Sequence, residues 1–281
     1  MQKGQPSRTA LGAASHRAAH QVLEQGAIFA DPLAVRILGD YADEALREAR
    51  NDPSKRRMRI FIAVRTRFAE DALAAAVTRG VRQLVVLGAG LDTFAYRNPF
   101  GEKLRVFEVD HPATQAWKRR GLALAGILEP PTLTFAPINF EREALPDGLA
   151  ATGFDRAQQS FFTWLSVVPY LTEQAVFSTL GFIANLPGGS HVVFDYANPA
   201  ASGPGEDEYA ALHRALSERV AKLGERIKTN FETDALHAKL SGMGFREIED
   251  LGPAVIKGRY FPSLQGPWKD RGGHILLATT T

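Results

Sequence analysis

Residues 84–93 read "LVVLGAGLDT", and this short stretch sets the expected fold of the whole chain. The run of Leu and Val stops at Gly88-Ala89-Gly90, which is typical of a buried strand that ends in a tight turn. Nucleotide-type cofactors bind over turns of this kind at the edge of a parallel sheet. The two glycines leave NAD, FAD and S-adenosylmethionine open as the ligand.

The sequence beyond this turn alternates short apolar runs with helical stretches. Strands alternating with helices indicate an α/β fold with a doubly wound, mostly parallel, Rossmann-like sheet. We predict seven strands, at residues 83–90, 104–110, 132–139, 156–165, 190–197, 245–252 and 273–280.

The first 80 residues have helical character and precede the sheet. The helical stretches are residues 9–25, 31–50 and 56–80. Asp31-Pro32 is expected to open the second as an N-cap followed by proline, and Gly80 to end the third. We expect one domain over residues 1–281, with residues 1–80 as an N-terminal helical lid on the core of 81–281.

The composition is that of an ordinary soluble globular protein. Hydrophobic residues make up 45% of the chain, charged residues 23%, and the net charge is only +2. The chain contains no cysteine, which excludes disulfides, thiolate metal sites and a cysteine nucleophile. No segment approaches the roughly 18 apolar residues of a membrane span, so we expect a cytoplasmic protein without a membrane partner.

Two short basic clusters occur at residues 54–59 and 117–120. Neither interleaves aromatic residues at base-stacking spacing, so we interpret both as solvated helix faces and expect no nucleic-acid partner. His16 and His20 stand at a spacing that can hold a metal on a helix, yet no third ligand accompanies them. We therefore expect two histidines on a polar helix face and no metal site.

The residues after the glycine turn favour one class of ligand. Asp110 ends the second predicted strand, 20 residues after Gly90, where a carboxylate can accept both hydroxyls of a ribose. A helix N-cap before Pro112 is the alternative role for Asp110. A dinucleotide fingerprint needs a third glycine or alanine where this chain has Thr93, and Asp92 disfavours a pyrophosphate. S-adenosylmethionine has cationic groups and no phosphate, so the pattern favours it over NAD.

Three stretches resemble the leucine carboxyl methyltransferase family. They are residues 82–97, "RQLVVLGAGLDTFAYR", 106–120, "VFEVDHPATQAWKRR", and 161–172, "FFTWLSVVPYLT". The chain most resembles the bacterial branch, which includes polyketide O-methyltransferases of the tetracenomycin type. The resemblance implies a class I methyltransferase fold with S-adenosyl-L-methionine as the cofactor.

The resemblance also implies which residues bind the methyl donor. Arg65 matches the arginine that pairs with the methionine carboxylate, although the neighbouring Arg67 is an alternative. The other matching positions are Gly88, Ala89 and Gly90 under the donor, Asp110 at the ribose, Asn139 and Phe140 beside the adenine, and Leu165 near the donor.

Two of these positions depart from the family's pattern. Asn139 stands where the family has an aspartate, and its carbonyl alone can accept from the adenine amino group. Leu165 stands where eukaryotic members have a glutamate. The loss of that carboxylate argues against the eukaryotic substrate, a protein phosphatase C-terminus.

The acceptor is expected to be a small molecule. A carboxylate, with a pKa of about 4, is ionised at neutral pH and needs no general base, whereas a phenol, at about 10, does need one. No His/Asp pair with general-base spacing stands out, which favours a carboxylate and leaves the catalytic residues unassigned. We therefore predict an S-adenosylmethionine-dependent O-methyltransferase, monomeric or homodimeric, that acts on a carboxylate or phenolic hydroxyl of a molecule such as a polyketide.

The acceptor pocket is predicted from an insertion and three aromatic residues. The insertion spans residues 198–231 and begins with the long loop 198–207. Trp164, Tyr170 and Tyr196 are predicted to contact the acceptor, with a place in the core as the open alternative for Trp164 and Tyr170. The alternative functions are a non-catalytic S-adenosylmethionine- or S-adenosylhomocysteine-binding protein and an NAD-binding oxidoreductase.

Overall fold

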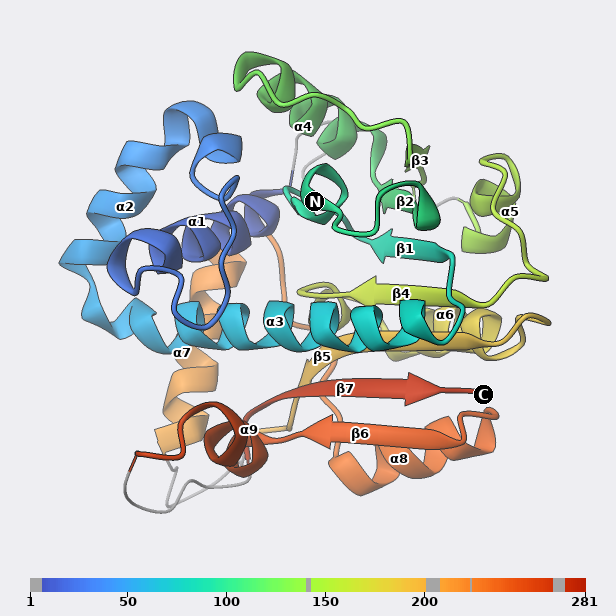
Figure 1. Ribbon diagram of the computed structural model, residues 1–281. Helices are drawn as coiled ribbons and strands as arrows, with labels where there is room; N and C mark the ends of the chain where they lie inside the picture. Colours follow the sequence, from blue (N-terminus) through green and yellow to red (C-terminus); the bar gives the residue numbers. More distant parts are fainter. Residues whose placement is uncertain (1–6, 140–142, 201–207, 223, 265–270) are drawn as a thin grey trace.

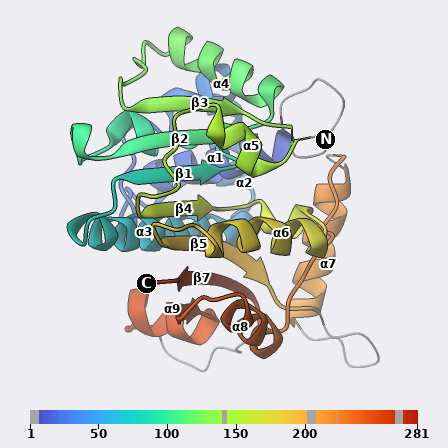
Figure 2. The same ribbon diagram turned by 90° about the vertical axis from the view of Figure 1, so that its right-hand side faces the viewer.

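The computed structural model describes residues 7–139, 143–200, 208–222, 224–264 and 271–281. A seven-stranded sheet runs through it in the order β3-β2-β1-β4-β5-β7-β6 (Figures 1 and 2). The strands are β1 (Gln83–Leu87), β2 (Arg105–Asp110), β3 (Leu133–Pro137), β4 (Ser160–Trp164), β5 (Ser190–Ala197), β6 (Glu247–Leu251) and β7 (Gly273–Thr279). All seven lie within the predicted runs, and the predicted fold class is confirmed.

Strand β1 lies at the centre of the parallel part of the sheet. All five of its residues are buried, as expected for a run of Leu and Val between two neighbouring strands. Leu87 pairs with Val109 of β2, and Val86 pairs with Thr163 of β4. Only β7 runs antiparallel, between β5 and β6. The carboxyl ends of β1, β2, β4 and β5 therefore meet at one edge of the sheet.

Helices cover both faces of this sheet. One face packs against α5 (Leu145–Ala150), α6 (Glu173–Ala184) and α8 (Thr233–Gly242), and the other against α3 (Arg56–Thr78) and α9 (Pro253–Tyr260). Helix α4 (Pro112–Leu124) joins β2 to β3. Short 3-10 helices are η2 (Pro53–Lys55), η3 (Phe94–Arg97), η4 (Gly101–Lys103) and η5 (Val168–Tyr170). Among the helices described here, none is long and apolar enough to cross a membrane.

The N-terminal helices gather at the edge toward which the arrowheads of β1 and β4 point (Figure 1). Helix α1 (Arg8–Leu23) packs against both α3 and α2 (Ala42–Asn51). The helix predicted over residues 31–50 is wrong in its first half, because residues 31–35 form a turn and η1 (Arg36–Tyr41) precedes α2. Gly39 interrupts the helix with φ 53°. Oδ1 of Asp31 caps only this first turn, by accepting the N–H of Leu33 at 3.0 Å, while Oδ2 accepts the hydroxyl of Thr93.

The insertion at residues 198–231 carries helix α7 (Glu208–Lys222). Its two ends are held together at the sheet edge, because the N–H of Asn198 donates to the carbonyl of Gly272 and the N–H of Phe231 donates to that of Ala197. The segment after α7 then reaches the sheet edge again, where the Lys228 N–H donates to the Pro169 carbonyl at 2.7 Å. The insertion therefore lies next to the loop that follows β4.

The glycine turn after β1 is closed on two sides by other parts of the chain. Gly88 and Gly90 have φ of 67° and 47°, a left-handed conformation that glycine adopts at no steric cost. A Cβ atom on Gly88 would lie 2.4 Å from Cγ2 of Val167, and one on Gly90 would lie 2.9 Å from Cβ of Ala10. Both glycines are thus required by backbone conformation and by space.

Gly88→Ala should destabilise the protein by roughly 2–4 kcal/mol, since it adds left-handed strain to a steric clash with Val167. Gly101→Ala is the matched control. Gly101 has φ 53°, but its Cβ would meet no atom of the described residues within 4 Å, so about 1–2 kcal/mol of strain alone is expected. Urea unfolding of both variants measures the difference, and equal losses would contradict the close approach of Val167.

Candidate functional site

The candidate site extends along the carboxyl ends of four neighbouring strands. Asp110 ends β2, the glycine turn follows β1, Ser166 and Val167 follow β4, and Asp195 lies near the end of β5. Neighbouring strands are about 4.8 Å apart, so the three intervals from β2 to β5 span about 14 Å. An elongated ligand laid across this edge would reach all four positions.

Asp110 connects β2 to the glycine turn. Its Oδ2 accepts the N–H of Gly90 at 2.6 Å, and its Oδ1 accepts the N–H of His111 at 2.6 Å. The N-cap of α4 is His111, whose Nδ1 accepts the N–H of Ala113, so the alternative role of Asp110 as this cap is excluded. Burial raises the pKa of Asp110 against these two hydrogen bonds, which favour the charged form. Each oxygen retains a second lone pair for a ligand hydroxyl.

Arg65 and Arg67 point in opposite directions from α3. Arg67 has 51% of its side chain exposed and donates to Asp71 on the same helix. Arg65 is only 5% exposed, and its Nη1 donates to Oδ2 of Asp195 at 2.9 Å. Its Nε is buried and has no hydrogen-bond partner among the described residues. Of the two predicted arginines, Arg65 therefore lies at the candidate site and has an N–H free for an anion.

One of the two predicted adenine contacts, Asn139, lies near Asp110. Asn139 follows β3, and the N–H of the preceding Ile138 donates to the carbonyl of Asp110 at 2.9 Å. Phe140, the other predicted adenine contact, lies outside the described residues. Leu165 directly follows β4 and lines a pocket between α3 and the sheet, together with Asp92 and Phe94.

The three predicted acceptor-binding aromatics differ in their surroundings. Trp164 is 2% exposed and packs in the hydrophobic core on the face of α6, so the core alternative fits it better. Tyr170 is half-buried at the end of η5, where burial raises its pKa to about 12 and the charges of Glu225, Asp195 and Arg65 act on it. Tyr170 thus lies beside the candidate site.

Tyr196 belongs to a buried polar cluster at the base of the insertion. Its hydroxyl donates to Oδ2 of Asp250 at 2.5 Å, and its ring stacks on that of His274. Oδ1 of Asn198 accepts the N–H of Gly272 and lies 2.9 Å from Nε2 of His274. These contacts make Tyr196 an anchor of the insertion, and an acceptor contact for it stays a prediction.

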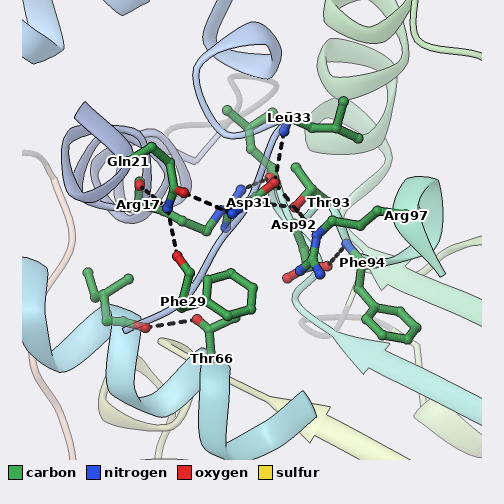
Figure 3. Close-up of polar contacts among 12 residues, drawn as sticks. Arg17, Gln21, Phe29, Asp31, Leu33, Thr66, Asp92, Thr93, Phe94 and Arg97 are labelled. Atoms are coloured by element: carbon green, nitrogen blue, oxygen red, sulfur yellow. Dashed lines mark hydrogen bonds and ion pairs between the residues drawn. The ribbon is translucent and has the colours of Figure 1, made fainter. Parts of the chain in front are cut away.

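Asp31 fastens the N-terminal segment to the loop after the glycine turn (Figure 3). Its carboxylate is fully buried, forms an ion pair with Nε of Arg17 at 2.9 Å and accepts the hydroxyl of Thr93 at 2.7 Å. Nη2 of Arg17 in turn donates to the carbonyl of Leu91. Arg97 adds its Nε, which donates to the Thr93 hydroxyl at 3.2 Å. We refer to Arg17, Asp31, Thr93 and Arg97 as the Asp31 clamp.

The clamp also bears on the choice between cofactor classes. Thr93 occupies the place of the third glycine in a dinucleotide fingerprint, and its side chain holds the N-terminal segment. The chain then enters η3, a single turn of four residues, instead of a long helix. A pyrophosphate site uses the amides at the start of such a helix, so this turn is poorly built for NAD.

Comparison with known proteins identifies the family. The model of the leucine carboxyl methyltransferase family matches residues 10–184, more than half of the chain. The chain belongs to this family. The protein YktD of Bacillus subtilis (strain 168), described as a candidate S-adenosyl-L-methionine-dependent methyltransferase, is 31% identical over 295 residues, covering 93% of each protein. A relative of the same description from Mycobacterium marinum is 34% identical over 70% of this chain and 63% of its own length.

The solved structure of a DUF574 family protein from Streptomyces avermitilis has the same fold. The TM-score is 0.52 at 16% identity, and the match covers 95% of this chain and 97% of that one. The comparisons confirm the family predicted from the sequence and S-adenosyl-L-methionine as the cofactor of its relatives. They do not single out the tetracenomycin-type branch, which stays a prediction.

Several side chains of this family member lie elsewhere than predicted. In the two basic clusters, expected to be solvated, Arg59 forms a buried ion pair with Glu24 and Lys118 forms one with Glu108. His20, expected on a polar face, is fully buried, and burial lowers its pKa. Within the described part of the chain, no group of three or more His, Cys, Asp or Glu could hold a metal.

Two acidic residues of the site were not predicted. Asp31 and Asp195 both occur in otherwise apolar or small-residue stretches, "IFADPLA" and "VVFDYA". A lone carboxylate in an apolar strand is a usable signal, because a buried charge requires a partner.

Asp31→Asn should lower the free energy of unfolding by about 3–5 kcal/mol, since it leaves the buried guanidinium of Arg17 without its counter-charge. The control is Asp71→Asn, which breaks the exposed pair with Arg67 and should cost less than about 1 kcal/mol. Chemical denaturation followed by circular dichroism compares the two. A loss for Asp31→Asn as small as that of the control would mean that the clamp does not hold the N-terminal segment.

Proposed function

We propose that this protein is an S-adenosylmethionine-dependent O-methyltransferase that methylates a carboxylate of a small molecule, such as a polyketide or another secondary metabolite. One arrangement carries the proposal. A buried arginine with an unpaired N–H, held by Asp195 of β5, and a carboxylate with free lone pairs at the end of β2 lie at the same edge of the sheet. S-adenosylmethionine is a nucleoside joined to an amino acid, so its carboxylate suits Arg65 and its ribose hydroxyls suit Asp110.

The residues at this edge fit the donor in charge as well as in shape. Arg65 offers a buried cationic N–H to the methionine carboxylate. Asp92 follows the turn, where a carboxylate suits a cationic ligand better than a phosphate. When bound, S-adenosylmethionine supplies a methyl group that is activated by the positive charge on its sulfur.

The chain's own contribution is to position the acceptor and to exclude water. Helix α1 lies on the glycine turn, and the hydroxyls of Ser7 and Thr9 donate to the carboxylate of Glu225, in the segment after α7. These contacts join the N-terminal segment to the insertion around the candidate site. Holding the acceptor oxygen in line with the methyl group there lowers the entropic part of the barrier.

The protonation state of Tyr170 favours a carboxylate acceptor. With a pKa raised to about 12 by burial, the hydroxyl stays protonated at neutral pH and can donate a hydrogen bond but cannot act as a general base. A carboxylate acceptor, ionised at neutral pH, needs no base. Tyr170 is therefore suited to orienting such an acceptor.

Calorimetric titration with S-adenosylhomocysteine and with NADH tests the cofactor. We expect binding of the nucleoside and no response to NADH, and the reverse would overturn the proposal.

A screen of small carboxylic acids and phenols with labelled donor then tests turnover. The departures at Asn139 and Leu165 favour, as the second candidate function, a protein that binds the nucleoside without transferring a methyl group. Methylation of any acceptor would eliminate it.

Asp110→Ala should weaken binding of S-adenosylhomocysteine about ten- to a hundredfold, since the ribose hydroxyls lose a charged acceptor. Asp110→Asn has the same size and retains an acceptor for the Gly90 N–H, but its NH2 group replaces the acceptor of the His111 N–H. We expect reduced affinity with a smaller loss of melting temperature than in Asp110→Ala. Affinity equal to that of the wild type in Asp110→Asn would exclude the ribose contact.

A further inference from the structure

Asp195 is a buried carboxylate within strand β5. It lies between Phe194 and Tyr196, which pack on the opposite face of the sheet, so its side chain shares the face of Val193 and helix α3. It is 6% exposed. A charge so deeply buried requires partners, and the structure gives it two from different segments of the chain.

The first partner of Asp195 is Arg65, and the second is the loop after β4. Oδ2 accepts Nη1 of Arg65 at 2.9 Å, and Oδ1 accepts the backbone N–H of Ser166 at 2.6 Å. Ser166 has φ 60°, an uncommon left-handed conformation for a residue with a side chain. Its strained backbone persists because its N–H donates a hydrogen bond to the buried carboxylate.

The loop held by Ser166 reaches the glycine turn directly. Val167 follows Ser166, and its Cγ2 occupies the space that a Cβ on Gly88 would need. Asp195 therefore fixes two things at once: the guanidinium of Arg65 and the loop that packs on the glycine turn.

The geometry of the ion pair leaves part of Arg65 available. Arginine and carboxylate often pair through two parallel hydrogen bonds. Here Oδ1 of Asp195 already accepts from Ser166, and Nε of Arg65 is buried with no partner in the part of the chain that the structure describes. An unpaired buried N–H is costly, so a ligand that brings an acceptor to this N–H gains a hydrogen bond at a group that has already lost its water.

We propose that Asp195 is a positioning residue for the methyl donor: it holds Arg65 by Nη1 so that Nε meets the methionine carboxylate. The inference rests on the proposed function and adds to it a residue that acts through Arg65. It predicts an effect confined to ligands that carry the amino-acid carboxylate.

Two ligands separate this role from general support of the fold. S-adenosylhomocysteine carries the carboxylate, whereas 5′-methylthioadenosine keeps the nucleoside thioether and lacks the amino-acid part, carboxylate and amino group alike. Asp195→Asn keeps an acceptor for the Ser166 N–H and removes the charge that holds Arg65. We expect at least tenfold weaker binding of S-adenosylhomocysteine and less than twofold change for 5′-methylthioadenosine.

A double-mutant cycle with Arg65→Met tests whether Asp195 acts through Arg65. In the Arg65→Met background, Asp195→Asn should change affinity for S-adenosylhomocysteine less than twofold. Leu180→Ala, in the core on the opposite face of the sheet, is the control that lowers stability and leaves both affinities unchanged. If the asparagine variant does not fold, Asp195→Glu replaces it. This variant keeps the charge but moves the carboxylate by one methylene, and its affinities for S-adenosylhomocysteine and 5′-methylthioadenosine are compared in the same way.

Equal weakening of both ligands, or additive effects in the cycle, would overturn the positioning role while leaving the proposed function intact. Failure of the wild-type protein to bind S-adenosylhomocysteine at all would overturn both. Selective loss of the carboxylate-bearing ligand, with non-additivity, would support the assignment.

Discussion

The buried carboxylate of Asp31 is the constraint on which the arrangement of the N-terminal helices depends. A fully buried charge is tolerated only with a close counter-charge and hydrogen bonds, and Asp31 finds these in Arg17 of α1 and Thr93 of the loop after β1. Satisfying this one group brings three separate segments together. The loop that follows the glycine turn is thereby fixed from the N-terminal side.

Two other carboxylates also hold loops in place along the same sheet edge. Asp110 accepts the N–H of Gly90, and Asp195 accepts that of Ser166, so each fixes a loop that has no regular ladder partner. Backbone N–H groups in such loops need acceptors when buried, and a carboxylate is a strong one. The edge is therefore shaped by acidic side chains on β2 and β5 and by the closeness of Val167 to Gly88.

Local patterns predicted the sheet well because its central strands are rich in β-branched, aromatic and other apolar residues, as in Gln83–Leu87, which is followed by Gly88. Local patterns gave wrong predictions where the position of a side chain depends on a partner that is distant in the sequence. Asp31-Pro32 has the local signature of a helix start, and Oδ1 of Asp31 does accept the N–H of Leu33. The helix is nevertheless interrupted at Gly39, and Oδ2 of Asp31 binds Arg17 and Thr93. Lys118 has the sequence context of a surface cation, but in the structure it forms a buried ion pair with Glu108 of β2. Arg65 and Arg67 differ only in which face of α3 they occupy, and packing alone decides that.

The contact between Ala10 and Gly90 joins the first helix to the turn itself. Ordering of the helix and binding of a ligand over the turn are therefore thermodynamically linked. The ordered helix strengthens ligand binding by the same free energy by which the bound ligand stabilises the helix. Residues near the start of the chain then influence affinity without touching the ligand. Protection of α1 from proteolysis or hydrogen exchange becomes a direct reporter of occupancy at the sheet edge.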